Sequence, residues 1–271
     1  MLEALIAAFF GLIIGSFLNV CIYRLPRDLS VARPARSFCP ECGKTIAWYD
    51  NLPVLSYFVL RRRCRHCAAV IPARYPLVEA LTAAAFFGAV MLHGVSLAGA
   101  RLALFSALIV ALVFTDLEER ILPDEMTLGG TVAGLAFAAF VPMKAGLVSM
   151  LLFERGARVQ SIAESVVGAL FSSLSIWLIG ELYWRVRHRE GLGFGDVKML
   201  AMIGAFLGLE GSVLTMMVGA ICGAVSGLVY TKVAGRDMAT YELPFGSFLG
   251  FAALVVAFAG DPALRWYAGA G

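Results

Sequence analysis

Long apolar stretches alternate with short polar segments along almost the whole chain. Eight apolar stretches can be marked, at 4–22, 76–93, 99–115, 126–142, 162–182, 197–209, 211–231 and 244–260. Most of them approach the ~20 residues that a helix needs to cross a ~30 Å hydrocarbon core. The pattern therefore predicts an all-α polytopic membrane protein with about eight transmembrane helices. Only Glu210 and Gly211 divide the sixth stretch from the seventh.

Composition agrees with the apolar pattern. The chain of 271 residues is 60% hydrophobic and 15% charged, and its mean hydropathy is +0.83. A soluble domain is about half apolar and about a quarter charged, so this chain belongs in lipid. The net charge of +3 is too small to indicate a nucleic-acid partner. The first stretch has Glu3 where a secretory signal carries basic residues, which favours a first transmembrane helix at 1–22.

The basic residues are unevenly distributed and predict an orientation. Residues 23–75 hold ten of the 22 Lys and Arg residues, and further basic residues follow the fifth and seventh stretches. Cytoplasmic loops are enriched in Lys and Arg, so these segments are expected in the cytoplasm and the N-terminus outside. The loop at 143–161 carries three basic residues on the expected outer side and fits this orientation least well.

The one extended polar region, 23–75, contains four cysteines in two C-x2-C pairs: Cys39, Cys42, Cys64 and Cys67. This spacing is typical of a structural zinc site, in which two tight turns supply a tetrahedral shell of thiolates. A piece this small usually needs a metal or disulfides to hold it together. Disulfides or free thiols are the alternative, and the expected cytoplasmic location argues against disulfides. His66 is expected to be exposed rather than a ligand.

Two aspartates end or begin apolar stretches on the same expected membrane side. Asp116 ends the third stretch, and Asp196 follows a glycine-rich tract in GLGFGDVKML. A charge near the bilayer interior costs roughly 2.5 kcal/mol or more, so these carboxylates need a reason to be there. A close pair would share one proton and could activate water and polarise a peptide carbonyl. The titration belongs to the pair, so neither residue is given a fixed role.

Simpler interpretations of these charged residues stay open. Asp196 fits an N-cap, and Asp124, after Pro123, fits a turn or a helix cap. Lys198 is expected to contact lipid head groups, with tuning of the aspartate pair as the alternative.

Several motifs in their order along the chain resemble those of the bifunctional prepilin peptidases. The tract CPECGKTIAWYDNLPVLSYFVLRRRCRHC, followed by IPARYPLVEA, is similar to their cytoplasmic loop, and DLEERILPDEMTL and GLGFGDVKMLAMIGAFLG are similar to their two aspartate motifs. GSFLNVCIYRLP and ELPFGSFLG also resemble segments of this family. The resemblance covers most of the chain, and the ordered set is far more specific than GxGD alone.

The resemblance implies an aspartic protease of the bacterial inner (cytoplasmic) membrane. Such enzymes cleave the leaders of prepilins and pseudopilins at the cytoplasmic face and then methylate the new N-terminal residue with S-adenosylmethionine. Carried over, Asp116 and Asp196 are catalytic, the four cysteines bind structural zinc, and Asp124 is supporting. Apart from protein substrates, membrane lipid is the expected partner, and nucleic acid is not.

The methyl-donor site is only weakly indicated. No glycine fingerprint of a Rossmann fold follows a predicted strand. RYPLVE offers Arg74, Tyr75 and Glu79, because a cationic methyl donor favours a carboxylate and an aromatic face. Anchoring of the second helix at the membrane interface is an equal alternative for Arg74 and Glu79.

The chain is thus expected to comprise a first transmembrane helix (1–22), a cytoplasmic four-cysteine zinc-binding domain (23–75) and a membrane-embedded aspartic peptidase domain (76–271). Two rival functions stay open. One is a GxGD intramembrane protease that acts on other membrane substrates without methyltransferase activity. The other is a zinc-dependent membrane scaffold or a transporter, although a transporter more often places its charges at the bilayer midplane.

Overall fold

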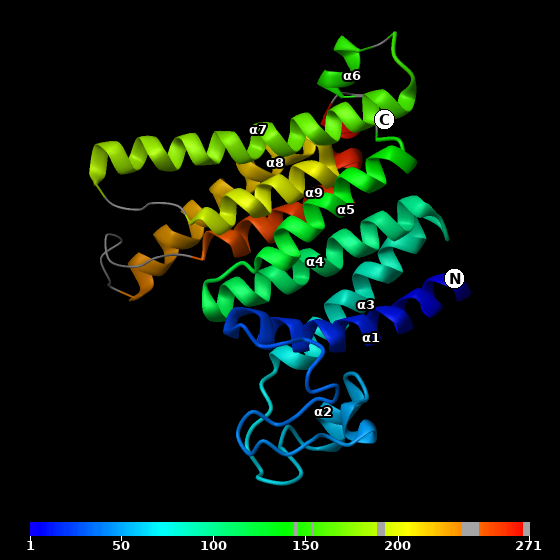
Figure 1. The fold of residues 1–271 in the computed structure, drawn as a ribbon, viewed down its shortest axis with the longest axis vertical. Coiled ribbons are helices and arrows are strands. Elements are labelled where there is room, and N and C mark those ends of the chain that lie inside the picture. Colours follow the sequence, from blue (N-terminus) through cyan, green and yellow to red (C-terminus); the bar gives the residue numbers. More distant parts are fainter. Residues whose placement is uncertain (144–145, 153, 189–192, 235–243, 268–271) are drawn as a thin grey trace. The chain divides into compact units, whose positions relative to one another are not determined.

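A computed structural model gives the fold of the protein, and it describes residues 1–143, 146–152, 154–188, 193–234 and 244–267 (Figure 1). Within these ranges the regular structure is helical, apart from two isolated β-bridges. The seven long helices are α1 (Leu2–Arg24), α3 (Arg74–His93), α4 (Leu97–Glu119), α5 (Asp124–Phe140), α7 (Ala157–Arg187), α8 (Phe194–Ala234) and α9 (Phe245–Tyr267). The short ones are η1 (Leu25–Arg27), η2 (Trp48–Asn51), α2 (Leu55–Val59) and α6 (Leu147–Leu151).

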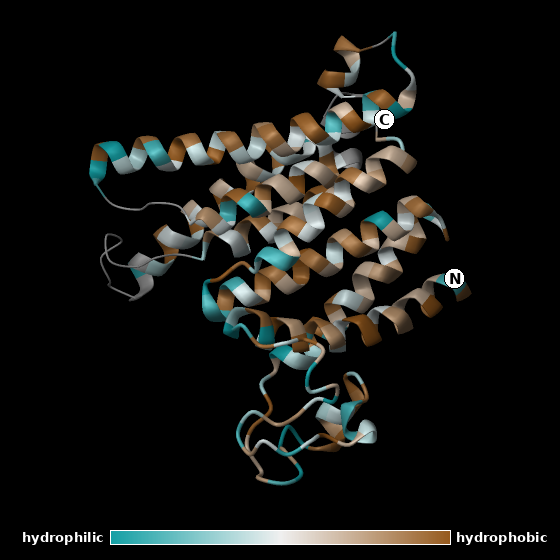
Figure 2. Ribbon diagram, viewed as in Figure 1, coloured by the Kyte–Doolittle hydropathy of each residue, from teal (hydrophilic) through white to brown (hydrophobic). Residues whose placement is uncertain are grey.

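The long helices coincide with the apolar stretches and make this a multi-pass membrane protein. Five described segments are long and apolar enough to cross a membrane: Leu2–Arg27, Arg74–His93, Leu97–Glu119, Ala157–Arg187 and Phe194–Tyr230. Phe245–Gly260 is a shorter apolar helix. In Figure 2 the long helices are mostly brown, and teal is concentrated at their ends and in the connections. The all-α membrane class expected from the sequence is confirmed.

Helix α8 joins the two stretches that were expected to be separate spans. Its helical assignment runs through both, but Gly208 interrupts it with φ 73° and ψ −171°. Glycine adopts a positive φ without the steric cost that a Cβ brings, so the chain bends there. The break was expected at Glu210 and Gly211. This position was wrong by a few residues, because hydropathy reports charge and not backbone conformation.

The chain forms two compact units, Met1–Thr115 and Asp116–Gly271. In the first unit α1 packs closely on α3. A Cβ at Gly15 would lie 2.6 Å from the Cα of Glu79, so only glycine allows the two backbones to approach this closely. Asn19 of α1 also donates from Nδ2 to the carbonyl of Tyr75, at 3.0 Å. The four-cysteine segment connects these two helices (Figure 1).

In the second unit, α7 packs along α8 through small and hydroxyl-bearing side chains. Ser165 and Ser172 of α7 donate from Oγ to the carbonyls of Ala205 and Leu200, at 2.6 and 2.9 Å. Side-chain hydrogen bonds between helices and close approach of small residues are the usual means of association in lipid. This packing fixes the N-terminal half of α8, which carries Asp196.

The loop at 143–161 contains the short helix α6, which the hydropathy pattern did not predict. Two carboxylates from neighbouring helices hold its first turn. Glu164 of α7 accepts from the Ser149 amide at 3.0 Å, and Glu210 of α8 accepts from the Leu147 amide at 3.1 Å. Free amides at a helix start favour carboxylate acceptors, which explains the buried position of Glu164. Residues 144–145 and 153 of this loop lie outside the described residues.

Candidate active site and candidate metal centre

Asp116 lies in the last turn of α4, where the helix is about to end. Arg120 follows in the left-handed conformation (φ 55°) and donates its amide to the Asp116 carbonyl at 3.0 Å. The Asp116 residue is only 6% exposed. The end of the helix therefore holds a carboxylate inside the protein and not in the connecting segment.

Asp196 lies in the first turn of α8. The helix begins at Phe194, so Asp196 is its third residue and not the N-cap that the sequence allowed. Its amide donates to the Gly193 carbonyl at 3.1 Å, and the residue is 8% exposed. The adjacent Gly195 packs on Leu122, which a Cβ at that position would approach to 3.1 Å. The glycine tract thus lets the start of α8 lie close against the segment before α5.

The two carboxylates meet at Gly246, near the start of α9. A Cβ built on Gly246 would lie 3.1 Å from Oδ2 of Asp116 and 3.1 Å from Oδ1 of Asp196. These two oxygens therefore lie no more than about 6.2 Å apart, since each is 3.1 Å from the same point. Both aspartates and Gly246 belong to the second unit. The close pair expected from the sequence is brought together here.

Ser247 holds one of the two carboxylates. Its amide and its hydroxyl both donate to Oδ2 of Asp116, at 2.6 and 2.7 Å. From the sequence, ELPFGSFLG only resembles a family segment, and no role is predicted for Gly246 or Ser247. The signal was a glycine and a hydroxyl two and three residues after Pro244, at the start of an apolar stretch.

Asp124 and Lys198 pair beside the aspartates. Lys198 Nζ lies 2.6 Å from Oδ1 of Asp124, and its ammonium also lies 5.0 Å from the centre of the Phe194 ring. The expected cap was wrong, because Pro123 is the N-cap residue of α5 and Asp124 is its first helical residue. The main expectation for Lys198, a lipid head group, is replaced by this ion pair. The pair joins the first turn of α5 to the second turn of α8.

The four cysteines converge as expected for a metal site. The Sγ atoms of Cys39, Cys42, Cys64 and Cys67 all lie within 4.8 Å of one another, and Cys39 and Cys67 are 3.9 Å apart. A tetrahedral Zn²⁺ with bonds of about 2.3 Å places its sulfurs about 3.8 Å apart, so the cluster fits zinc. His66 is exposed and does not belong to this cluster.

The two cysteine knuckles have the same backbone structure, shifted by 25 residues. In the first, Cys39 donates to the Lys44 carbonyl and Gly43 donates to the Cys39 carbonyl. In the second, Cys64 donates to Ala69 and Ala68 donates to Cys64. The isolated bridges Phe38–Thr45 and Arg63–Val70 are related by the same shift. The same repeat is visible in the sequence, where CPECGKTI and CRHCAAVI correspond position by position.

Backbone amides prepare one thiol for metal binding. The amides of Cys67 and His66 point at Cys64 and lower the pKa of its thiol to about 7. The thiolate is the form that binds metal, so these amides favour the ligand form of Cys64.

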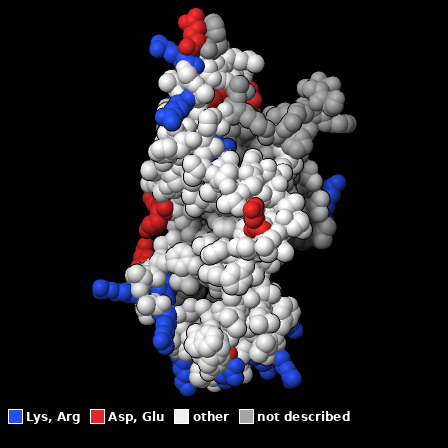
Figure 3. Space-filling view, turned by 90° about the vertical axis from the view of Figure 1, so that its right-hand side faces the viewer, with Lys and Arg blue, Asp and Glu red and all other residues white. Residues whose placement is uncertain are grey.

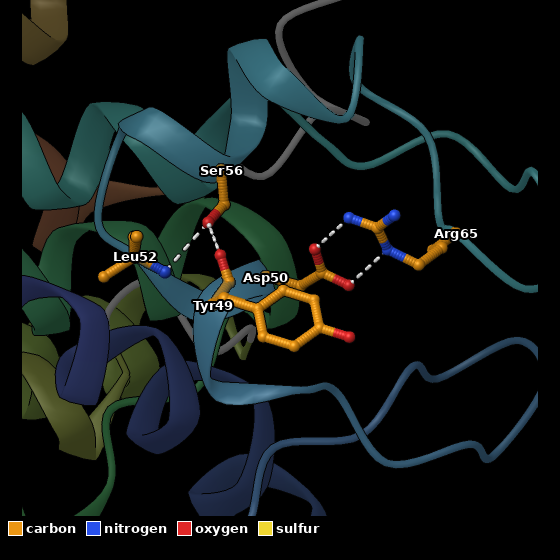
Figure 4. A network of polar contacts seen from close by, with 5 residues as sticks. All are labelled: Tyr49, Asp50, Leu52, Ser56 and Arg65. Atoms are coloured by element: carbon orange, nitrogen blue, oxygen red, sulfur yellow. Dashed lines mark hydrogen bonds and ion pairs between the residues drawn. The ribbon is translucent and has the colours of Figure 1, made fainter.

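A polar network ties the segment between the knuckles to the second knuckle (Figure 4). Arg65 makes two hydrogen bonds to Asp50, at 2.6 and 2.7 Å, and lowers the pKa of that carboxyl. Ser56 accepts from the Leu52 amide at 2.8 Å and donates to the Tyr49 carbonyl at 3.2 Å. Lys and Arg side chains are frequent around this subdomain, at the lower end of the view in Figure 3.

The residues suggested for a methyl donor make contacts that favour the anchoring alternative. The Arg74 guanidinium lies 4.6 Å from the centre of the Tyr75 ring, so a protein cation already covers one face of it. Glu79 is buried and accepts from the Val54 amide at 2.6 Å and from the Ser16 side chain. The role of these three residues in methyl transfer stays a prediction.

Comparisons with known proteins agree with the motifs. Residues 9–93 match the family described as bacterial peptidase A24 N-terminal domain, and residues 102–228 match the type IV leader peptidase family. No solved structure matches the chain.

Three similar curated proteins are all named prepilin leader peptidase/N-methyltransferase. The one from Myxococcus xanthus is 39% identical over 83% of this chain, which covers 62% of that protein. The one from Burkholderia pseudomallei strain 1026b is 36% identical over 93% of the chain and 84% of that protein. The one from Legionella pneumophila is 32% identical over 98% of the chain and 94% of that protein.

Proposed function

Because the chain belongs to the type IV leader peptidase family, we propose that it cleaves the leader of prepilins and pseudopilins and then methylates the new N-terminal residue. The observation that carries the peptidase proposal is that two buried carboxylates, Asp116 and Asp196, both lie next to Gly246. Their helices reach this point from different parts of the chain. Burying two carboxylates at the edge of the lipid costs free energy, and a purely structural role does not explain this cost.

The aspartates act as a pair that shares one proton. The ionised carboxylate takes a proton from water, and the protonated one polarises the carbonyl of the scissile peptide bond. The pair lies at the end of α4 and at the start of α8, which supports a site near one membrane surface. A scissile bond at the membrane edge can reach it without being drawn through the hydrocarbon.

The location proposed is the bacterial inner membrane, with the active site and the four-cysteine region in the cytoplasm. The concentration of Lys and Arg in 23–75 supports this orientation. We retain 1–22, 23–75 and 76–271 as a first helix, a zinc-binding domain and a peptidase domain. Zinc held by Cys39, Cys42, Cys64 and Cys67 would stabilise the second of these as a structural ion.

The methyl donor proposed is S-adenosylmethionine, since the names of the relatives include N-methyltransferase activity. The contacts of Arg74, Tyr75 and Glu79 described above agree with the alternative, anchoring of the second helix. No step of methyl transfer is therefore assigned to them.

Mass spectrometry of a prepilin incubated with the purified membrane protein tests the proposal. We expect loss of the leader without S-adenosylmethionine, and loss of the leader plus gain of one methyl group with it. Asp116→Asn and Asp196→Asn should each slow cleavage by roughly 10²–10⁴-fold, because each removes one partner of the acid–base pair. Asp28→Asn is the matched control, since Asp28 is exposed and Asn tolerates its positive φ of 53°.

The same assay separates the rival functions. Cleavage of other membrane substrates but not of prepilins would indicate a different GxGD protease. Absence of cleavage from every substrate in a panel would indicate a scaffold. Full activity in either aspartate variant would contradict the dyad.

A further inference from the structure

Ser247 makes two hydrogen bonds to the Asp116 carboxylate. Its amide and hydroxyl both donate to the same atom, Oδ2 of Asp116, at 2.6 and 2.7 Å. These are short hydrogen bonds of the kind that an ionised acceptor makes. The Asp196 carboxylate accepts a hydrogen bond from the Gly193 amide and faces the Asp116 carboxylate.

The charged groups around the pair add to this asymmetry. Arg120, one turn after Asp116 on the same helix end, places a positive charge near Asp116. From α8 the group that faces Asp116 is Asp196 itself. The part of α9 that begins at the aspartates, 245–258, contains no ionisable side chain. A cation and two donors favour the ionised form of Asp116 over that of its partner.

We propose that Ser247 is a positioning residue that keeps Asp116 ionised and leaves the shared proton on Asp196. The proposal rests on the proposed peptidase function and deepens it by giving each aspartate a role. Asp116 becomes the base that activates water, and Asp196 becomes the acid that faces the scissile carbonyl.

The proton movements then balance over one cycle. Asp116 takes a proton from water as the water oxygen bonds to the carbonyl carbon, and Asp196 gives its proton to the carbonyl oxygen. In the second half the carbon–nitrogen bond breaks, and Asp116 passes its proton to the leaving nitrogen. Asp196 recovers a proton from one hydroxyl of the tetrahedral intermediate, whose carbonyl re-forms. Both aspartates end as they began.

Substitutions at Ser247 test the positioning role. Ser247→Ala removes one of the two donors and should lower kcat for leader cleavage by about 10-fold to 100-fold, the usual effect of losing a hydrogen bond to a charged group. KM should change by less than about twofold, because the lost bond acts on the reacting groups and not on substrate binding. Ser247→Thr keeps the hydroxyl and should restore most of the rate.

A matched control is available on α7. Ser173 donates from Oγ to the Ala169 carbonyl within its own helix, at 2.7 Å, so Ser173→Ala removes a similar hydrogen bond away from the aspartates. It should leave kcat unchanged. An unchanged kcat in Ser247→Ala, or a Ser247→Thr variant that folds like wild type but is as slow as Ser247→Ala, would overturn the positioning role.

The division of roles has its own test, which does not need a Ser247 variant. Asparagine at 196 can still donate an N–H to the carbonyl oxygen, whereas asparagine at 116 cannot take a proton from water. Slow cleavage measured over long incubation should therefore be about 10-fold faster in Asp196→Asn than in Asp116→Asn, with mass spectrometry to exclude deamidation. Equal residual rates, or the reverse order, would overturn the assignment. Cleavage by the wild-type protein would still support the proposed function, so the two failures are distinguishable.

Discussion

Ala68 is the residue at which the second cysteine knuckle departs from the first. It has φ 58°, and the equivalent residue of the first knuckle, Gly43, has φ 68°. A Cβ in the left-handed region costs roughly 1–2 kcal/mol, and glycine avoids this cost. A Cβ added to Gly43 would meet nothing within 4 Å, so the backbone conformation alone decides the effect of a substitution there.

Two substitutions of opposite sign follow from this difference. Ala68→Gly should tighten zinc binding by about 1 kcal/mol, or about fivefold, and Gly43→Ala should weaken it by a similar factor, because metal binding and folding are coupled in such a site. Competition with a chelating dye measures both. Ala69→Gly is the control, since Ala69 is outside the positive-φ positions and should gain nothing. Weaker binding in Ala68→Gly would contradict the strain argument.

The importance of single residues was predictable where the residue type is unusual for its place in the sequence. Asp116 and Asp196 stood out because carboxylates are rare at the edge of apolar stretches, and the cysteines because of their spacing. Gly246 and Ser247 were missed because a glycine and a serine are ordinary in a membrane helix. Only their position next to Asp116 in space gives them a role.

At the level of helices, an ion pair joins α5 and α8 near the active site. Lys198 is in the second turn of α8, where the positive end of the helix dipole disfavours a cation, and Asp124 compensates it. The Asp124 side chain is 56% exposed, so the pair contributes only a few tenths of a kcal/mol to about 1 kcal/mol to stability. Its main effect is expected on the position of Asp196, two residues away.

Lys198→Ala and Asp124→Ala should each lower kcat/KM for leader cleavage by about 3-fold to 10-fold. The double variant should be no slower than either single one, because residues that act through one contact are not additive. Arg185→Ala is the control, since it breaks an exposed pair with Glu181 on α7. Effects that multiply in the double variant would show that the two side chains act independently.

The helices themselves were the most predictable part, because lipid requires each spanning segment to satisfy its own backbone hydrogen bonds. All eight apolar stretches are helical in the structure. The bend at Gly208 and the short helix α6 were missed for a common reason. Both depend on backbone conformation and on the carboxylates of other helices, which a hydropathy pattern along the chain does not contain.

At the scale of the whole molecule, the chain divides within α4, between Thr115 and Asp116. The first unit holds the four cysteines, and the second holds both aspartates with Gly246 and Ser247. The sequence placed the metal site and the aspartates in different regions, at 23–75 and 76–271. It did not indicate a division inside an apolar stretch, because hydropathy is continuous there.

Removal of zinc should therefore loosen one part of the protein and spare the other. Between the two knuckles the described secondary structure is limited to η2 and α2, so the metal supplies much of the order of 23–75. In the variant with Cys39→Ser and Cys64→Ser, bound zinc should be lost. Hydrogen exchange at the Gly43 and Ala68 amides, which are hydrogen-bonded within the knuckles, should then rise by at least about 100-fold.

Amides of α7 and of the first half of α8 should keep their protection in the same variant, because their packing lies within the second unit. Cys21→Ser is the matched control, since Cys21 is a buried cysteine of α1 outside the metal cluster and its loss should not release zinc. Loss of protection in α7 and α8 together with the knuckles would show that the two units unfold as one. Full zinc content in the double cysteine variant would show that these thiols do not hold the metal.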